Sequence, residues 1–305
     1  MKHKINVYHI PVLAPESLDA LRINQSGIYV DATFGGGGHS AALLERLDGH
    51  GRLFGFDQDV DSMRNIPDDS RFVYVHSNFR YMYNFLRYHN VLGKVDGLLA
   101  DLGVSSHHFD DPDRGFSYRF SGPLDMRMNR MGKLTAADVV RTYDEEALAG
   151  IFLLYGELRQ ARQIASAVVT ARRNKDLGRV ENLLEVLEPF VRHDREKKFL
   201  SQLFMALRME VNDEISALKE MLEHIPAALK QGGRFAIISY HSLEDRLVKN
   251  YIKSGNFEGD NPKDIYGNLP SPFRRINTKV ITPPPEEIER NPRSRSAKLR
   301  VAERL

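Results

Sequence analysis

The most constraining feature of the sequence is a run of four glycines, Gly35–Gly38, between an apolar run and a helix-like stretch. The apolar run is Ile28–Val30 and the helix-like stretch is Ser40–Leu47. Because glycines carry no β-carbon, the polar part of a ligand could approach main-chain N–H groups at a helix N-terminus, where the helix dipole is positive. The segment therefore predicts a ligand-binding turn, although a glycine run can also be a plain turn.

Three further apolar runs place this turn at one edge of a parallel sheet. Each run ends near a residue that a nucleoside could contact: Leu53–Phe56 ends at Asp57, Phe72–Val75 is followed by Phe79, and Val95–Ala100 ends at Asp101. Ligands of open α/β sheets lie outside the carboxyl ends of the strands. An acidic residue about twenty positions beyond such a turn is also where ribose hydroxyl groups bind. One nucleoside could therefore contact all four strand ends.

The class of cofactor depends on details of the turn. An NAD-binding G-x-G-x-x-G pattern requires glycine or alanine at its last position, and counting from Gly35 places Ser40 there. Asp31, the last residue of the first strand, could accept a hydrogen bond from an ammonium group, which S-adenosylmethionine carries and NAD lacks. The turn therefore favours S-adenosylmethionine and a methyltransferase.

The composition is typical of a cytoplasmic enzyme. The 305 residues include no cysteine, which excludes disulfides, thiolate metal sites and a catalytic thiol. No apolar stretch approaches the ~20 residues of a membrane span, and Met1–Tyr8 lack the apolar core of a signal peptide. No His and carboxylate cluster has metal-ligand spacing, so we expect no catalytic metal. The net charge is only +2, but nine basic and four acidic residues from Pro270 onward permit RNA binding.

The order of elements predicts an inserted domain. Strands and helices alternate as far as Asp101, and the next strong strand is Arg234–Tyr240. A single crossover helix cannot fill so long an interval. We therefore assign residues 1–108 and 199–305 to a Rossmann-like domain and residues 109–198 to an all-helical insert for substrate recognition.

Hydrophobic periodicity predicts the remaining elements. Helices are expected at 136–154, 161–172, 180–191, 203–229 and 242–252, the last with Ser242 and Asp245 as its capping pair. Two antiparallel edge strands are expected at 279–282 and 298–302. The loop 107–129 is long enough to be a lid.

A series of short motifs, in a fixed order, resembles one family. The motifs are Asp31-Ala-Thr-Phe-Gly-Gly-Gly-Gly-His-Ser40, Asp101-Leu-Gly-Val-Ser-Ser106, Arg114-Gly-Phe-Ser117, Gly122-Pro-Leu-Asp-Met-Arg-Met128, Tyr155-Gly-Glu157, Ala206-Leu-Arg208, Asn212-Asp-Glu214, His241-Ser-Leu-Glu-Asp-Arg246 and Asn291-Pro-Arg-Ser-Arg-Ser296. They resemble the motifs of the bacterial 16S ribosomal RNA (cytosine-N4)-methyltransferases of the RsmH (MraW) type. The resemblance extends from His9 almost to the C-terminus.

This resemblance implies a seven-stranded Rossmann-like sheet that binds S-adenosyl-L-methionine. It implies N4-methylation of one cytidine in the decoding centre, at the P site, of 16S ribosomal RNA. The RNA would be presented by the assembled or assembling small ribosomal subunit, and the family makes a homodimer plausible. Carried over residue by residue, the cofactor contacts are Gly37, Gly38, His39, Asp57, Phe79, Asp101 and His108, the last at a position where the family usually has Gln.

The residue closest to methyl transfer is expected to be Asp101, with Ser105 and Ser106 shaping its surroundings. Asp101 could instead be a helix cap or a strand-end carboxylate facing water. Many amino methyltransferases place Asp, Asn or Ser before two prolines and an aromatic residue at this point, whereas this chain has Asp101-Leu-Gly-Val. The acceptor for the amino hydrogens therefore stays open.

Four other motif residues are expected to contact RNA: Arg114, Arg127, Arg208 and His241. For the three arginines a structural ion pair is an equally good explanation, and for His241 a strand-end histidine with its own partners is one.

Other functions also stay open. A small-molecule or protein methyltransferase would act without a ribosomal substrate, a dinucleotide oxidoreductase would bind NAD, and a noncatalytic RNA-binding protein would transfer nothing.

Overall fold

The computed structural model describes residues 11–259 and 271–305, so the expectations for Met1–Tyr8 and His9 lie outside the described residues. The chain forms two compact units. The first contains the chain up to Gly103 together with Ser216–Leu305, and we call it the sheet unit. The second is Val104–Ile215, the helical unit.

The helical unit is longer than the expected insert of residues 109–198, chiefly because of α9 (Glu196–Val211). This helix contacts α5 (Ala136–Thr142) and α6 (Glu145–Leu154), and its Leu203 and Phe204 are buried in the same core as those helices. The C-terminal boundary of the unit therefore lies beyond α9, and not at residue 198, which is in the first turn of this helix.

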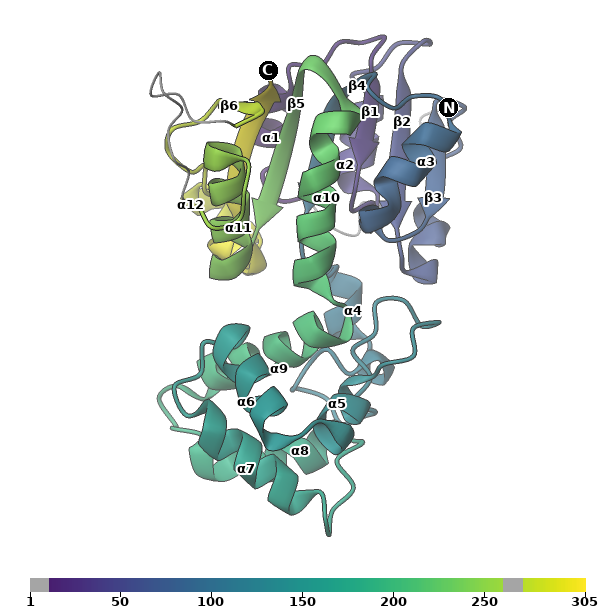
Figure 1. Cartoon of the computed structure of the whole chain (residues 1–305). Helices are drawn as coiled ribbons and strands as arrows, with labels where there is room; N and C mark the ends of the chain where they lie inside the picture. The colour runs from purple at the N-terminus through teal and green to yellow at the C-terminus, as the bar shows by residue number, and fades with distance from the viewer. Residues whose placement is uncertain (1–10, 260–270) are drawn as a thin grey trace. The chain divides into compact units, whose positions relative to one another are not determined.

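Seven strands form one sheet in the order β3-β2-β1-β4-β5-β7-β6 (Figure 1). Their bounds are Ile28–Asp31 (β1), Arg52–Asp57 (β2), Phe72–His76 (β3), Val95–Asp101 (β4), Leu229–Ser239 (β5), Phe273–Arg275 (β6) and Lys298–Arg304 (β7). Strands β1 to β5 are parallel, while β7 is antiparallel to both β5 and β6. The strand order reverses at β1 and β4, a switch point where ligands of such sheets bind beyond the carboxyl ends. We call this end of β1 to β5 the carboxyl edge.

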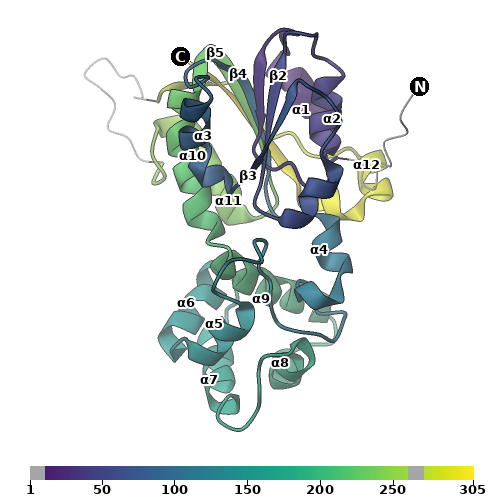
Figure 2. The same ribbon diagram turned by 90° about the vertical axis from the view of Figure 1, so that its right-hand side faces the viewer.

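Helices cover both faces of this sheet. Figure 2 shows α3 (Met82–Tyr88), α10 (Glu214–Ala228) and α11 (Ser242–Ser254) on one side, and α1 (Ala14–Leu21) and α2 (Gly38–Leu44) on the other. Strands that are buried on both faces need apolar residues at nearly every position. This explains why β1, β2 and β4 are apolar along most of their length, and it confirms the predicted α/β class.

The helical unit packs around its own apolar core. Its other helices are α4 (Ser106–Asp110), α7 (Ala161–Ala171) and α8 (Val180–Leu187). The single helix expected at 136–154 is divided into α5 and α6, because the Asp144 carboxylate accepts the N–H of Ala147 at 2.8 Å and starts a new helix.

The helix expected at 203–229 is likewise two helices, α9 and α10. The chain turns at Asp213, which has a left-handed φ of 48°. The side chain of Asn212 ends α9 by donating to the carbonyls of Arg208 and Met126, both at 2.8 Å, and it accepts the N–H of Met128 at 2.7 Å. Asn212 therefore ties the end of α9 to the loop that precedes α5.

The prediction of a strand at 279–282 is wrong, and the sixth strand of the sheet is β6. Within the former segment only Ile281 forms an isolated bridge, to Leu299. The side chain of Asn277 takes the place of strand pairing here, since it accepts the N–H of Val301 at 2.8 Å and donates to the Leu299 carbonyl at 3.2 Å. Phe273 anchors β6 through its ring, 5.0 Å from that of Phe235.

Candidate cofactor site at the carboxyl edge of the sheet

The glycine turn joins β1 to α2 at the carboxyl edge. Gly35 and Gly37 have left-handed φ angles of 50° and 77°, which side chains rarely adopt. A β-carbon on Gly36 would meet no atom within 4 Å, so the backbone there borders open space. At Gly38, in contrast, a β-carbon would lie 3.1 Å from Pro11. The turn thus leaves one stretch of main chain open to a ligand and is packed beyond it.

Asp57, at the end of β2, holds this turn in place. Its Oδ2 accepts the N–H of Gly35 at 2.7 Å, and its Oδ1 accepts the N–H of Asp59 at 2.8 Å. Burial raises the pKa of the Asp57 carboxyl to about 6. Each carboxylate oxygen has a second lone pair, so Asp57 can still accept hydroxyl groups of a ribose.

Asp31 lies behind the turn and does not face solvent. Its side chain is fully buried, where Oδ2 accepts the hydroxyl of Ser40 at 2.7 Å and Oδ1 accepts the N–H of Thr33 at 3.1 Å. The expectation that Asp31 receives the ammonium group of a ligand finds no support in the structure, because its side chain is 0% exposed. Burial raises the pKa of this carboxyl to about 6, with Ser40 and Thr33 opposing the shift.

We expect the variant Asp31→Asn to change how stability depends on pH. Because folding raises the Asp31 pKa from 3.8 to about 6, the folded chain holds this proton more tightly than the unfolded chain. Protonated Asp31 therefore adds about 3 kcal/mol to the free energy of unfolding. This contribution is fully present below pH 4 and is lost as the pH rises through 6. Urea unfolding between pH 4 and 7.5 should show a flatter profile for Asp31→Asn than for the wild type. Parallel profiles would contradict the assignment.

Asp101, at the end of β4, is the centre of a second polar group at this edge. Its N–H donates to Thr33 Oγ1 at 2.7 Å, and its Oδ1 accepts the hydroxyl of Tyr240 at 2.9 Å. Its Oδ2 lies 4.0 Å from His39 Nδ1, and 23% of its side chain is exposed. Burial raises the pKa of Asp101 to about 6, whereas His39 and the Tyr240 hydroxyl act in the opposite direction. Asp101 is thus a partly exposed carboxylate with a fixed orientation.

His39 connects Asp101 to the segment before α1. Its Nε2 lies 3.0 Å from the carbonyl oxygen of Val12. A carbonyl oxygen only accepts hydrogen bonds, so Nε2 carries the hydrogen and Nδ1 is the atom on the Asp101 side. Phe79, which follows β3, is half-buried at the same edge. The sheet unit therefore brings together the glycine turn, His39, Asp57, Phe79 and Asp101, as the strand spacing predicted.

Ser105 and His108 belong to the helical unit. The Nδ1 of His108 lies 3.1 Å from Ser105 Oγ, and the His108 ring is 4.9 Å from that of Phe116. His108 is 6% exposed. Their expected roles beside the cofactor stay predictions.

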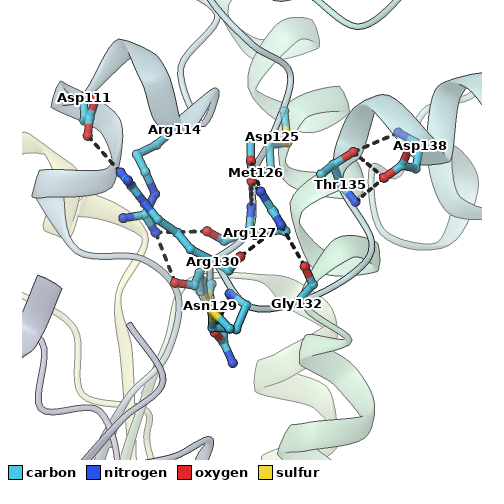
Figure 3. A network of polar contacts seen from close by, with 12 residues as sticks. Asp111, Arg114, Asp125, Met126, Arg127, Asn129, Arg130, Gly132, Thr135 and Asp138 are labelled. Carbon is cyan, nitrogen blue, oxygen red and sulfur yellow. Dashed lines mark hydrogen bonds and ion pairs between the residues drawn. The ribbon is translucent and has the colours of Figure 1, made fainter. Parts of the chain in front are cut away.

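Two motif arginines form a polar network inside the helical unit (Figure 3). Arg114 is 1% exposed and donates to the carbonyls of Arg127 and Met128 at 2.9 and 3.1 Å, which gives this side chain an internal structural role. The RNA contact expected of it stays a prediction. Arg127 forms a bidentate pair with Asp125 at 2.9 and 2.6 Å and also donates to the Gly132 carbonyl. The expected loop 107–129 begins with α4, and the segment that follows this helix is held by its own arginines.

Arg208 forms a bidentate pair with Glu214 at 2.7 and 2.9 Å, and both side chains are almost buried. RNA contacts by Arg127 and Arg208 stay predictions.

His241 is 7% exposed and serves as the N-cap of α11. Its Nδ1 accepts the N–H of Leu243 at 3.3 Å, and the side chain of Glu244 accepts the N–H of His241. This capping pair replaces the expected pair of Ser242 and Asp245.

Sequence reasoning missed two residues of the site, Thr33 and Tyr240. Thr33 lies within the glycine motif, but only the fold shows that its hydroxyl receives the Asp101 N–H. Tyr240 follows β5, the neighbour of β4 in the sheet. Tyr240 could have been identified from the sequence as a polar residue that directly follows a strand. That strand, β5, lies beside β4, which ends in Asp101.

No group of three or more His, Asp and Glu residues in the described ranges is arranged to hold a metal ion. Among the helices of the described residues, none has the length and apolar character needed to cross a membrane.

The sheet order, its antiparallel last strands and the polar groups at the switch point define a Rossmann-like α/β fold with a candidate ligand site at its carboxyl edge. The chain belongs to the MraW methylase family, whose model matches residues 6–305. It is 60% identical over 305 residues to the Ribosomal RNA small subunit methyltransferase H of Parabacteroides distasonis, with 100% of both chains covered. It is 59% identical over 304 residues to the protein of the same name in Bacteroides fragilis, again with 100% of both covered. A solved structure of a putative rRNA-methylase from Clostridium thermocellum covers 97% of this chain and 98% of its own, with 13% identity and a TM-score of 0.43.

For a member of a methylase family the expected methyl donor is S-adenosyl-L-methionine. The residues at the carboxyl edge fit its parts. The open main chain at Gly36 borders space for a polar chain, and the lone pairs of Asp57 suit ribose hydroxyl groups. Phe79 supplies an aromatic ring at the next strand end. The individual contacts stay predictions.

Proposed function

We propose that this enzyme methylates the N4 amino group of one cytidine in the decoding centre, at the P site, of 16S ribosomal RNA. The reaction takes place in the cytoplasm, on the assembled or assembling small subunit. The observation that carries this proposal is the identity of 60% and 59% to two proteins named Ribosomal RNA small subunit methyltransferase H. That identity extends over the whole chain and so includes the helical unit, where a substrate-binding role would reside.

The chemistry requires a group that accepts hydrogen bonds from the amino group. The N4 lone pair is delocalised into the cytosine ring, so N4 is a weak nucleophile. When bound, S-adenosyl-L-methionine supplies a methyl group attached to a positively charged sulfur. Methyl transfer would form a carbon–nitrogen bond as the carbon–sulfur bond breaks; S-adenosyl-L-homocysteine would leave, and the proton lost by N4 would pass to water. Asp101 is the acceptor we assign, because it lies at the switch point, is partly exposed and has a fixed carboxylate.

The basic C-terminal segment supports a nucleic-acid substrate. Lys298 and Arg300 pair with Asp245, whereas Arg275, Lys279 and Arg295 are exposed. Exposed cations of this kind neutralise phosphates and give affinity that falls as the salt concentration rises.

The test is transfer of tritium from labelled S-adenosyl-L-methionine to small ribosomal subunits that lack their modifications, followed by nucleoside analysis. We expect the label in N4-methylcytidine, about one methyl group per subunit, and none with fully modified subunits. Naked 16S RNA as a parallel substrate shows whether the assembled subunit is required. Label in another nucleoside, or no transfer to either RNA, would contradict the proposal.

A further inference from the structure

The hydroxyl of Tyr240 is the only uncharged side-chain donor that the described hydrogen bonds place on the Asp101 carboxylate, at 2.9 Å. The two residues come from neighbouring parallel strands. In the register of β4 and β5, Asp101 pairs with Ile238, two positions before Tyr240. The sheet therefore fixes both backbones, and the side chains meet beyond the carboxyl ends.

Each partner is held by a further hydrogen bond. The N–H of Tyr240 donates to Glu244 Oε2 at 3.1 Å, in the first turn of α11. The N–H of Asp101 donates to Thr33 Oγ1 at 2.7 Å, in the glycine motif. The Tyr240 ring is itself half-buried. Because the backbone on both sides is anchored, the contact between hydroxyl and carboxylate is preorganised.

Charged groups from several elements surround this contact. Asp31 from β1 and Glu244 from α11 act on Asp101 as like charges, and His39 from α2 acts as an opposite charge. Glu287 from α12 (Pro285–Arg290) acts on Tyr240. Two neighbouring carboxylates and partial burial disfavour the ionised form of Asp101. The Tyr240 hydroxyl favours the ionised form of Asp101, because it donates a hydrogen bond to the carboxylate. This hydrogen bond is made to Oδ1.

We propose that Tyr240 is a positioning residue that acts through Asp101: its hydroxyl occupies Oδ1, leaves Oδ2 on the His39 side and keeps the carboxylate available as an acceptor for the substrate amino group. The inference rests on the proposed function only in the role it gives to Asp101. Tyr240 itself does not contact the reacting atoms.

Removing the hydroxyl has a defined consequence for the dependence of the reaction on pH. Burial already raises the pKa of Asp101 to about 6, and the Tyr240 hydrogen bond opposes that shift. In Tyr240→Phe the pKa of Asp101 therefore rises further, by about one unit or more for a hydrogen bond to a charged group. The acceptor is then protonated over a wider pH range, so the acid limb of the rate profile moves to higher pH.

The experiment compares the wild type with Tyr240→Phe and with Tyr251→Phe as a matched control. Tyr251 is also in the sheet unit and is 6% exposed, but its ring packs against Phe257 and Phe273 instead of the carboxyl edge. Single-turnover methyl transfer is measured from pH 5.5 to 9. We expect Tyr240→Phe to be about threefold slower than wild type at pH 6.5 and nearly equal above pH 8.5, as follows from a one-unit shift. Tyr251→Phe should follow the wild-type profile.

A second measurement reads the same contact without catalysis. The carboxyl carbon of Asp101 is followed by NMR in protein labelled with ¹³C at aspartate, with Asp101→Asn used to assign the resonance. We expect its titration midpoint to be higher in Tyr240→Phe than in wild type and unchanged in Tyr251→Phe. Equal midpoints would overturn the inference. If the midpoint moves but the pH profile of methylation does not, the hydrogen bond between Tyr240 and Asp101 exists, but Asp101 is not the acceptor. That result would contradict the proposed role of Asp101.

Discussion

Replacing Asp101 with alanine is expected to slow methyl transfer by at least about a hundredfold while leaving the fold intact. The variant removes the only carboxylate that we assign to the cytosine amino group, and positioned groups of this kind contribute about 10²- to 10⁴-fold to the rate. Stability should not fall, because burial raises the pKa of this carboxyl and the ionised form is already disfavoured in the folded state. Tritium transfer under single-turnover conditions measures the rate, and thermal unfolding checks the fold.

The matched control for this variant is Asp19→Ala. Asp19 lies in the sheet unit on α1, with 72% of its side chain exposed and an ion pair to Arg46. An exposed pair of this kind contributes little to stability, so this variant should retain wild-type turnover. Near-normal turnover by Asp101→Ala would refute the role of Asp101 in the reaction.

Replacing Asp57 with alanine should weaken the binding of S-adenosyl-L-methionine by about ten- to a hundredfold. The change removes the expected acceptor for ribose hydroxyl groups, and hydrogen bonds to a charged group contribute about 1.5 to 3 kcal/mol each. It also removes the partner of the Gly35 N–H, which shapes the glycine turn. Isothermal titration measures the affinity.

The variant Asp57→Asn separates these two effects. Its side-chain oxygen can still accept the Gly35 N–H, while its NH₂ group replaces one acceptor by a donor. We therefore expect an affinity between those of the wild type and Asp57→Ala. Unchanged affinity in Asp57→Ala would contradict a ribose contact at this position.

The central strands and the glycine turn could be predicted because burial on both faces leaves a direct trace in the sequence. Strands such as β2 and β4 are apolar along most of their length and end in a carboxylate, Asp57 or Asp101. The edge strands leave no such trace. β6 is three residues long, and the pairing next to it is made by the side chain of Asn277, which no hydrophobic pattern can reveal.

The domain boundary and the role of the arginines were harder to predict for a different reason. The apolar stripe of α9 shows that the helix is buried against something, but not which unit it packs in. A motif around Arg114 or Arg208 that resembles those of a family does not distinguish an RNA contact from an internal one. Only the fold shows that Arg114 is buried among backbone carbonyls and that Arg208 pairs with Glu214.

The same limit applies to carboxylates at the carboxyl edge. Asp31 and Asp57 both end strands and look equivalent in the sequence, yet Asp31 is enclosed by Ser40 and Thr33 whereas Asp57 is half-buried. Sequence position therefore predicts which edge a residue occupies, but the neighbouring side chains decide whether it faces a ligand.

The most direct test of the cofactor site is a crystal structure of the protein with S-adenosyl-L-methionine bound. We predict that the methionine part of the cofactor lies against the glycine turn, Gly35–His39, and that a ribose hydroxyl lies within hydrogen-bond distance of the Asp57 carboxylate. Density for the cofactor elsewhere on the chain, or none at saturating concentration, would contradict the site.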